Sequence, residues 1–163
     1  PADPSKALVD AGDGVFVPWT TNTITLKGQR IRFRGDWRNS SGNFRDLFNG
    51  TFGSGHSVTM SGGFDFEGAP ASDMFRATFY GCSGLTGSIP VGLFGDISGA
   101  PANYMFGWTF EACSSLTGES ALMPDGTTHL YKQFPTASTT HSDGCYRNAT
   151  GLNDYATMPA AWK

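Results

Sequence analysis

Apolar residues recur in pairs along the middle of the chain, first around residue 74 and again around residue 105. Met74 and Phe75 are followed by Phe79 and Cys82, so the apolar positions fall at offsets of one, five and eight. This spacing is typical of a short helix with one buried face. Ser72 stands where an N-cap residue would begin that helix. The pattern therefore predicts a short amphipathic helix in each segment.

The same pattern returns after 31 residues. The segment from Gly68, GAPASDMFRATFYGCSGLTG, agrees with that from Gly99, GAPANYMFGWTFEACSSLTG, at thirteen of twenty positions. The segment that begins at Phe44 fits the same 31-residue shift less closely, and the segment at Tyr146 aligns with that at Phe110 after a shift of 36. A brief strand ended by Pro90 follows the first helix pattern. Because one strand and one short helix cannot bury an apolar stripe alone, we expect about four stacked coils, which is a β/α repeat solenoid.

The ends of such a stack need covers. Before the repeats, the chain alternates apolar and polar residues on both sides of Lys27-Gly28, which predicts a β-hairpin. Its apolar residues can face one way: Ile24, Leu26, Ile31 and Phe33. The residues expected to close the other end are Tyr155, Met158 and Trp162. The chain is thus predicted to be one domain, with an arm and hairpin cap in residues 1–43 and coils with a C-terminal cap in residues 44–163.

The repeated stretches TFYGCSGLTGSIP and TFEACSSLTGES resemble the F-x-x-C-x-x-L-T signature of BspA-like leucine-rich repeats. This family occurs in surface proteins of gut and oral bacteria and of some protists. The resemblance covers roughly residues 44–162 and implies a secreted or surface-anchored protein of the adhesin type with a leucine-rich-repeat-like stack. The family often carries many coils, whereas this chain has about four, so a long surface that wraps a ligand is not expected.

Composition narrows the possible partners. The chain has 163 residues, a formal net charge of −3 and only 11 Lys and Arg residues, which argues against nucleic acid and anionic lipid as partners. It is rich in glycine and poor in charge, which is typical of a turn-rich secreted protein. No apolar run is long enough to span a membrane. The start at Pro1 suggests a processed mature form or a trimmed chain.

Catalytic and metal-binding patterns are weak. The three histidines share no spacing with one another or with carboxylates that predicts a metal site: His56, His129 and His141. His141 and Cys145 are four residues apart, but no nucleophile turn or orienting third group accompanies them. Asp65 and Glu67 could serve a glycosidase only across a cleft, and we interpret them as solubilising charge. We therefore expect no enzyme, no cofactor and no metal.

The cysteines follow the repeat. Cys82 and Cys113 occupy equivalent positions, whereas Cys145 aligns with Thr78 and Thr109 and lies outside their column. Reduced, buried thiols are favoured, although a disulfide between the two equivalent cysteines stays open. Three sequons are interpreted as chance matches in a chain rich in Ser and Thr: Asn39, Asn49 and Asn148.

Arginines gather beside the predicted hairpin, on one face of its second strand: Arg30, Arg32 and Arg34, with Arg38 nearby. They could form a patch for a sulfated glycan or an acidic surface. The interpretation that we favour is that these arginines lie on an edge strand, where their charges prevent pairing with strands of other chains.

Aromatic residues appear on the side of the coils opposite the Phe stripe. Asp73 and Ala77 become Tyr104 and Trp108 one coil later. Exposed aromatics often mark binding surfaces, although Trp108 could instead cover a neighbouring coil. The candidate binding surface consists of Tyr80, Tyr104, Trp108 and Trp37.

These features predict a non-enzymatic binding or adhesion module, extracellular or at a cell surface, that recognises a protein or glycan. The alternative is a structural subunit of a surface layer, filament or virion. A monomer is favoured, with self-assembly left open, and neither nucleic acid nor membrane insertion is expected.

Overall fold

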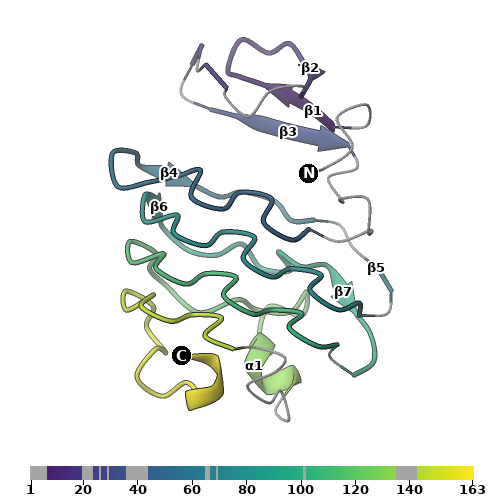
Figure 1. The fold of residues 1–163 in the computed structure, drawn as a ribbon, viewed down its shortest axis with the longest axis vertical. Coiled ribbons are helices and arrows are strands. Elements are labelled where there is room, and N and C mark those ends of the chain that lie inside the picture. The colour runs from purple at the N-terminus through teal and green to yellow at the C-terminus, as the bar shows by residue number, and fades with distance from the viewer. Residues whose placement is uncertain are drawn as a thin grey trace.

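The structure is a computed structural model, and it describes residues 7–19, 24–25, 27–28, 30–35, 44–64, 67–68, 70–100, 102–134 and 143–163. A small N-terminal sheet lies at one end, a stack of chain turns forms the middle, and helix α1 lies with the C-terminus at the other end (Figure 1).

The N-terminal sheet has three antiparallel strands in the order β2-β1-β3. They are β1 (Ala7–Asp10), β2 (Val17–Pro18) and β3 (Arg32–Gly35). Strand β3 pairs along its whole length with β1, with Val9 opposite Phe33.

The predicted hairpin around Lys27-Gly28 is therefore wrong in its pairing, because β3 takes its described partner from the start of the chain. Lys27 donates its backbone N–H to Ala11 O at 2.9 Å, so this segment runs past the end of β1. Leu26 lies outside the described residues. The rings of Trp19 and Phe33 contact Phe48 at centroid distances of 6.4 and 5.1 Å, which places the sheet against the first stacked segment.

The segments predicted to be helices are turns. In residues 73–82 alternate N–H groups bond within the segment, as when Arg76 N donates to Asp73 O at 3.1 Å. The N–H groups between them bond the next segment, as when Phe75 N donates to Met105 O at 2.8 Å. In an α-helix the interior N–H groups donate to carbonyl oxygens of the same helix, so they cannot form hydrogen bonds to a neighbouring segment. We call the four stacked segments the turn stack: residues 44–50, 73–82, 104–113 and 143–150.

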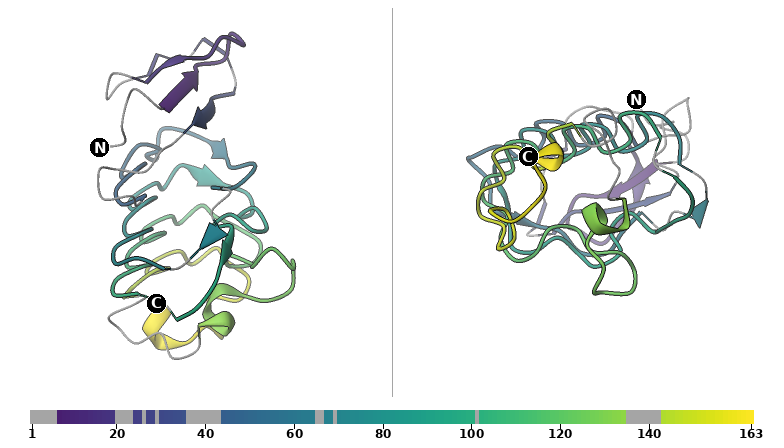
Figure 2. Two further views of the ribbon diagram at one scale, coloured as in Figure 1. Left: turned by 90° about the vertical axis from the view of Figure 1, so that its right-hand side faces the viewer. Right: turned by 90° about the horizontal axis from the view of Figure 1, so that it is seen from below.

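Positive backbone φ angles recur every four residues in the turn stack. Asp73, Ala77 and Gly81 have φ of 59°, 52° and 71°. A left-handed residue cannot continue a right-handed α-helix, so one at every fourth position prevents a helix from forming. Seen along their common axis, successive segments lie over one another (Figure 2).

The β/α repeat solenoid of leucine-rich-repeat type is therefore a wrong prediction. Within the part of the chain that the structure describes, the helices are α1 (Leu130–Gln133) and the 3-10 helix η1 (Ala160–Trp162). Neither lies in a segment for which a helix was expected. The remaining elements are short strands and turns, because left-handed residues at every fourth position replace the continuous helical hydrogen bonds.

Aromatic rings form the core of the turn stack. Phe48, Phe79, Phe110 and Tyr146 make one column, with successive centroids 5.5, 5.3 and 5.5 Å apart and nearly parallel planes. A second column holds Phe44, Phe75 and Phe106. These contacts confirm the 31-residue register, although the backbone that carries the rings is not helical.

Short parallel strands pair on the opposite side of the core. Strand β4 (Val58–Thr59) pairs with β6 (Leu85–Thr86), and β5 (Glu67–Gly68) pairs with β7 (Asp96–Ile97). The strand expected as far as Pro90 is therefore only two residues long. Gly84, just before β6, lies against backbone, because a Cβ there would meet His56 O at 2.6 Å.

The C-terminal residues cover the last segment of the turn stack. Trp162 in η1 is buried, and Tyr146 N donates to Trp162 O at 2.8 Å. The Trp162 ring lies 5.9 Å from that of Phe106 and 6.2 Å from that of Tyr146. Met158 is buried and Tyr155 is partly buried beside them. Among the described helices, none is long and apolar enough to span a membrane.

Candidate functional site

An open groove of about 340 Å³ crosses the outer face of the turn stack. Its walls come from all four stacked segments, because each segment presents its outward side chains at equivalent positions. Among the described residues it is lined by Arg45, Asp46, Asn49, Arg76, Ala77, Tyr80, Trp108, Glu111 and Arg147. We call it the aromatic groove.

Two aromatic residues at this groove stand on left-handed backbone. Tyr104 and Trp108 have φ of 51° and 58°, a region that bulky L-residues rarely adopt. The equivalent residues one segment earlier are Asp73 and Ala77, with similar φ angles. The backbone conformation therefore belongs to the turn stack itself, and the third segment carries large rings on it.

Arg76 joins the aromatic residues. Its guanidinium carbon lies 4.4 Å from the centroid of the Trp108 ring and 5.1 Å from that of Tyr104. Its Nη1 donates to Asp73 Oδ1 at 2.8 Å, which holds the guanidinium in place. Tyr80 is 39% exposed and Tyr104 38%, so parts of both rings face solvent. A fixed guanidinium beside partly exposed rings offers planar polar and apolar contacts together.

The charges around the groove are paired. Arg45 Nη1 lies 3.8 Å from Asp73 Oδ1, and Arg147 Nη1 lies 3.5 Å from Glu111 Oε2. Arg147 Nη2 also lies 3.4 Å from Asp143 Oδ1. Exposed pairs of this kind contribute about 0–1 kcal/mol each. Their side chains can therefore exchange a protein partner for a ligand group at small cost.

The structure brings three of the four predicted surface residues together. Tyr80 and Trp108 line the aromatic groove, and Tyr104 lies beside it across Arg76. Trp37 is outside the described residues. The arginines of the groove were missed, although Arg76 stands within the variable positions of the repeat and so carried a signal.

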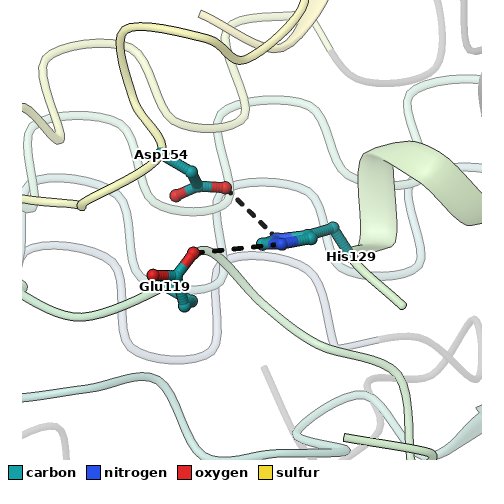
Figure 3. Close-up of side chains that lie close together, drawn as sticks. All are labelled: Glu119, His129 and Asp154. Atoms are coloured by element: carbon teal, nitrogen blue, oxygen red, sulfur yellow. Dashed lines mark ion pairs between the residues drawn. The ribbon is translucent and has the colours of Figure 1, made fainter. Parts of the chain in front are cut away.

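A second group of polar residues lies near the C-terminal end. Glu119, His129 and Asp154 come from three loops, and both carboxylates point toward the imidazole of His129 (Figure 3). Asp154 Oδ2 is 3.2 Å from His129 Nδ1, and Glu119 Oε2 is 3.9 Å from His129 Nε2. We call this group the histidine cluster. No pattern in the sequence pointed to it.

The histidine cluster does not have the geometry of a nucleophilic triad. Ser120 Oγ is 3.0 Å from His129 Nδ1, the same nitrogen that Asp154 approaches. In a triad the serine and the carboxylate use opposite nitrogens of the ring, and the carboxylate on the other nitrogen, Glu119, is 3.9 Å from Nε2, beyond hydrogen-bond distance. Ser120 is also buried, and its Oγ donates to Asp154 Oδ2 at 2.6 Å. These contacts orient the carboxylate and do not activate the hydroxyl.

Two weaker catalytic patterns from the sequence contain residues outside the described chain. Those residues are His141, in the pair with Cys145, and Asp65, in the pair with Glu67. Cys145 is fully buried, and this burial raises the pKa of its thiol, which disfavours the nucleophilic thiolate. Cys82 and Cys113 are free and buried as well. Their thiols lie 2.9 and 3.0 Å from the carbonyl oxygens of Phe48 and Phe79.

The predicted arginine face is only partly described. Arg32 pairs with the buried Asp10, its Nε donating to Oδ2 at 2.8 Å, and Arg34 lies 4.5 Å over the Phe16 ring. Both stand on β3, an edge strand of the sheet, and the interpretation that these charges prevent pairing with other chains stays a prediction. Arg38 and the sequon at Asn39 are outside the described residues, whereas Asn49 and Asn148 are exposed.

Comparisons with known proteins give no relative: no protein-family model, curated protein or solved structure matches the chain. The resemblance to BspA-like repeats therefore stays a prediction, carried by the F-x-x-C-x-x-L-T stretches alone.

Proposed function

We propose that the chain is a non-enzymatic binding module, extracellular or at a cell surface, and that its aromatic groove recognises a protein or glycan. The observation that carries this proposal is Trp108, a tryptophan on left-handed backbone in the wall of an open groove. A non-glycine residue held in this region costs on the order of 1–3 kcal/mol. Glycine would fill the backbone position without that cost.

The chemistry around Trp108 supports a polar ligand with flat or apolar faces. Aromatic side chains give a large contact area at low entropic cost, and arginine forks donate to paired acceptors. Both kinds of group line this groove, with Tyr80, Arg76 and Arg147 near the indole. The arginines are balanced by neighbouring carboxylates, which favours a ligand without a strong net charge.

A structural subunit is the second candidate, and one observation favours it. Strand β2 is at the edge of the N-terminal sheet, and Val15 and Val17 are 58% and 46% exposed there. Because β2 is two residues long and ends in Pro18, backbone pairing there is limited, and association would depend on the exposed valine side chains. An assembly through this edge would leave the aromatic groove open, so the two functions call for separate tests.

The test of the binding function is a glycan array and a panel of extracellular matrix proteins, probed with the full chain and with Trp108→Gly. Glycine suits the left-handed position, so this variant removes the ring without straining the backbone. We expect the variant to lose at least about tenfold in affinity for any ligand found, since single aromatic anchors carry such losses.

The matched control is Val91→Ser, which alters an exposed apolar residue outside the groove lining and should leave affinity unchanged. Equal binding by Trp108→Gly and the unmodified chain would contradict the proposal. Sedimentation velocity separates the second candidate, because a structural subunit would form ordered polymers that Val17→Lys disperses.

A further inference from the structure

We propose that the histidine cluster is a binding site for a divalent transition-metal ion, with zinc as its best match. This inference goes beyond the proposed function and does not depend on it. One ligand atom each from Glu119, His129 and Asp154 lies within 4.8 Å of the other two. The three residues are far apart in the sequence, and the fold alone brings them together.

The donor set selects the metal. One imidazole nitrogen and two carboxylate oxygens suit zinc and related transition metals, whereas calcium and magnesium prefer oxygen ligands only. Zinc bonds of about 2.0–2.1 Å place tetrahedral ligands roughly 3.3 Å apart. Asp154 Oδ2 lies 3.2 Å from His129 Nδ1 and Glu119 Oε2 lies 3.9 Å from His129 Nε2. One ion can bind only one of these nitrogens, and a set of one nitrogen and two carboxylate oxygens lies within 4.8 Å. Binding therefore requires the ligand atoms to move closer together, and the exposed Glu119 side chain has the freedom to do so. Three protein ligands leave a fourth position for water.

Neighbouring donors already orient both carboxylates. Asn153 Nδ2 donates to Glu119 Oε1 at 3.1 Å, which leaves Oε2 on the side of His129. Ser120 N donates to Asp154 Oδ1 at 3.0 Å, and Ser120 Oγ shares Oδ2 with the imidazole. Metal sites in proteins commonly fix their ligands through such outer contacts.

Burial and charge favour an ion at this place. The side chains of His129 and Asp154 are 13% and 9% exposed, whereas Glu119 is 47% exposed and lies on the open side. Two carboxylates and a single imidazole keep a net negative charge in either protonation state of the histidine. The ion pairs of both carboxylates within the described chain are with His129. A divalent cation would neutralise this charge.

A metal here would link parts of the C-terminal end. Glu119 follows the third segment of the turn stack, His129 precedes α1, and Asp154 lies in the segment that leads to η1. A metal ion that binds only the folded state stabilises that state, so it would hold the C-terminal residues against the last segment of the turn stack.

The experiment uses the full chain after chelator treatment, titrated with zinc chloride in a calorimeter and with Co²⁺ in the visible spectrum. We expect one ion per chain, the intense visible absorption of tetrahedral Co²⁺, and a higher melting temperature in zinc. Glu119→Gln keeps the size of an exposed side chain and should weaken zinc binding at least about tenfold. His129→Asn should abolish the cobalt spectrum.

The control is His56→Asn, which removes an exposed histidine outside the cluster and should change nothing. Unchanged melting of Glu119→Gln without metal shows that its fold is intact. The proposal is overturned if the unmodified chain binds neither ion. It is also overturned if His56→Asn removes the binding, or if Glu119→Gln and His129→Asn bind zinc as the unmodified chain does.

Discussion

Arg76 lies over the ring of Trp108, its guanidinium carbon 4.4 Å from the centroid, and it does so across two neighbouring segments of the turn stack. Trp108 reaches this contact from a backbone φ of 58°. The indole therefore depends on a conformation that tryptophan itself disfavours.

The first prediction separates the backbone strain from the ring. Trp108→Gly and Trp108→Ala both remove the indole and its contact with Arg76, but only alanine keeps a Cβ on left-handed backbone. We expect the glycine variant to be more stable by about 1 kcal/mol in urea unfolding. Equal stability of the two variants would show that the backbone relaxes at this position.

The second prediction concerns the ring column. Phe110 is fully buried between Phe79 and Tyr146, with centroids 5.3 and 5.5 Å away. Phe110→Ala should lower the free energy of unfolding by about 3–5 kcal/mol, because the cavity cannot close between stacked rings. The exposed Val91→Ala should change it by less than about 0.5 kcal/mol. A small loss for Phe110→Ala would mean that the column adds little to stability.

The third prediction is a loss of stability in acid. Backbone N–H donors, first that of Gly12, and the Arg32 side chain hold the pKa of Asp10 below its usual range. Asp10 therefore stabilises the fold above the unfolded pKa, near 3.9, and this contribution is lost as the pH falls through the lowered folded pKa. Asp10→Asn should reduce the urea midpoint at pH 7 and flatten its decline in acid.

For Asp10 the matched control is Asp96→Asn, which changes an exposed carboxylate in β7. It should leave the acid dependence as it is in the unmodified chain. The same pH profile for both variants would exclude Asp10 as its source.

The fourth prediction concerns the thiols. Cys82, Cys113 and Cys145 are buried and free, and burial raises the pKa of each. A thiol reagent at pH 8 should therefore leave the native chain unmodified for as long as the fold persists, and should modify all three cysteines in denaturant. Ser54→Cys, at an exposed position, should react at once. Fewer than three reactive thiols in the unfolded, unreduced chain would reveal a disulfide.

The fifth prediction concerns the C-terminal cover. Removing residues 155–163 takes away Trp162 and exposes the rings of Phe106 and Tyr146. We expect the truncated chain to aggregate, as seen by light scattering, whereas the full chain should elute mainly as a monomer. Removing Lys163 alone is the control, and it should not cause aggregation because Trp162 still covers the two rings. Ordered polymers of the full chain would show that its ends are not closed.

The sequence could predict which residues stack but not the backbone that carries them. Phe75 stacks on Phe106 as the alignment requires. The helix prediction failed because a four-residue period and the 3.6-residue period of an α-helix differ by less than one residue over two turns. Apolar residues spaced by four therefore fit both structures. The left-handed residues of the second segment are Asp73, Ala77 and Gly81. Glycine and, less often, aspartate adopt this conformation, whereas alanine rarely does. Hydrogen bonds between segments decide the outcome, and no local pattern contains them.

The two sites differ in the same way. Tyr80 and Trp108 could be predicted because they interrupt a repeat at positions that face away from the Phe stripe. Glu119, His129 and Asp154 could not, because they stand in loops without a periodic pattern and meet only through the fold. Partners of this kind have no common spacing in the sequence.

The hydrogen-bond ladder of the turn stack has a polarity. Phe48 donates to the segment that follows it, and Phe79 and Phe110 do the same. Peptide dipoles aligned in one direction add together, so the end at residues 143–150 is the positive pole and the end at residues 44–50 the negative pole. The two ends are therefore not interchangeable. Another copy of the chain that extended the ladder would have to add head to tail, because a two-fold dimer would place donors against donors or acceptors against acceptors.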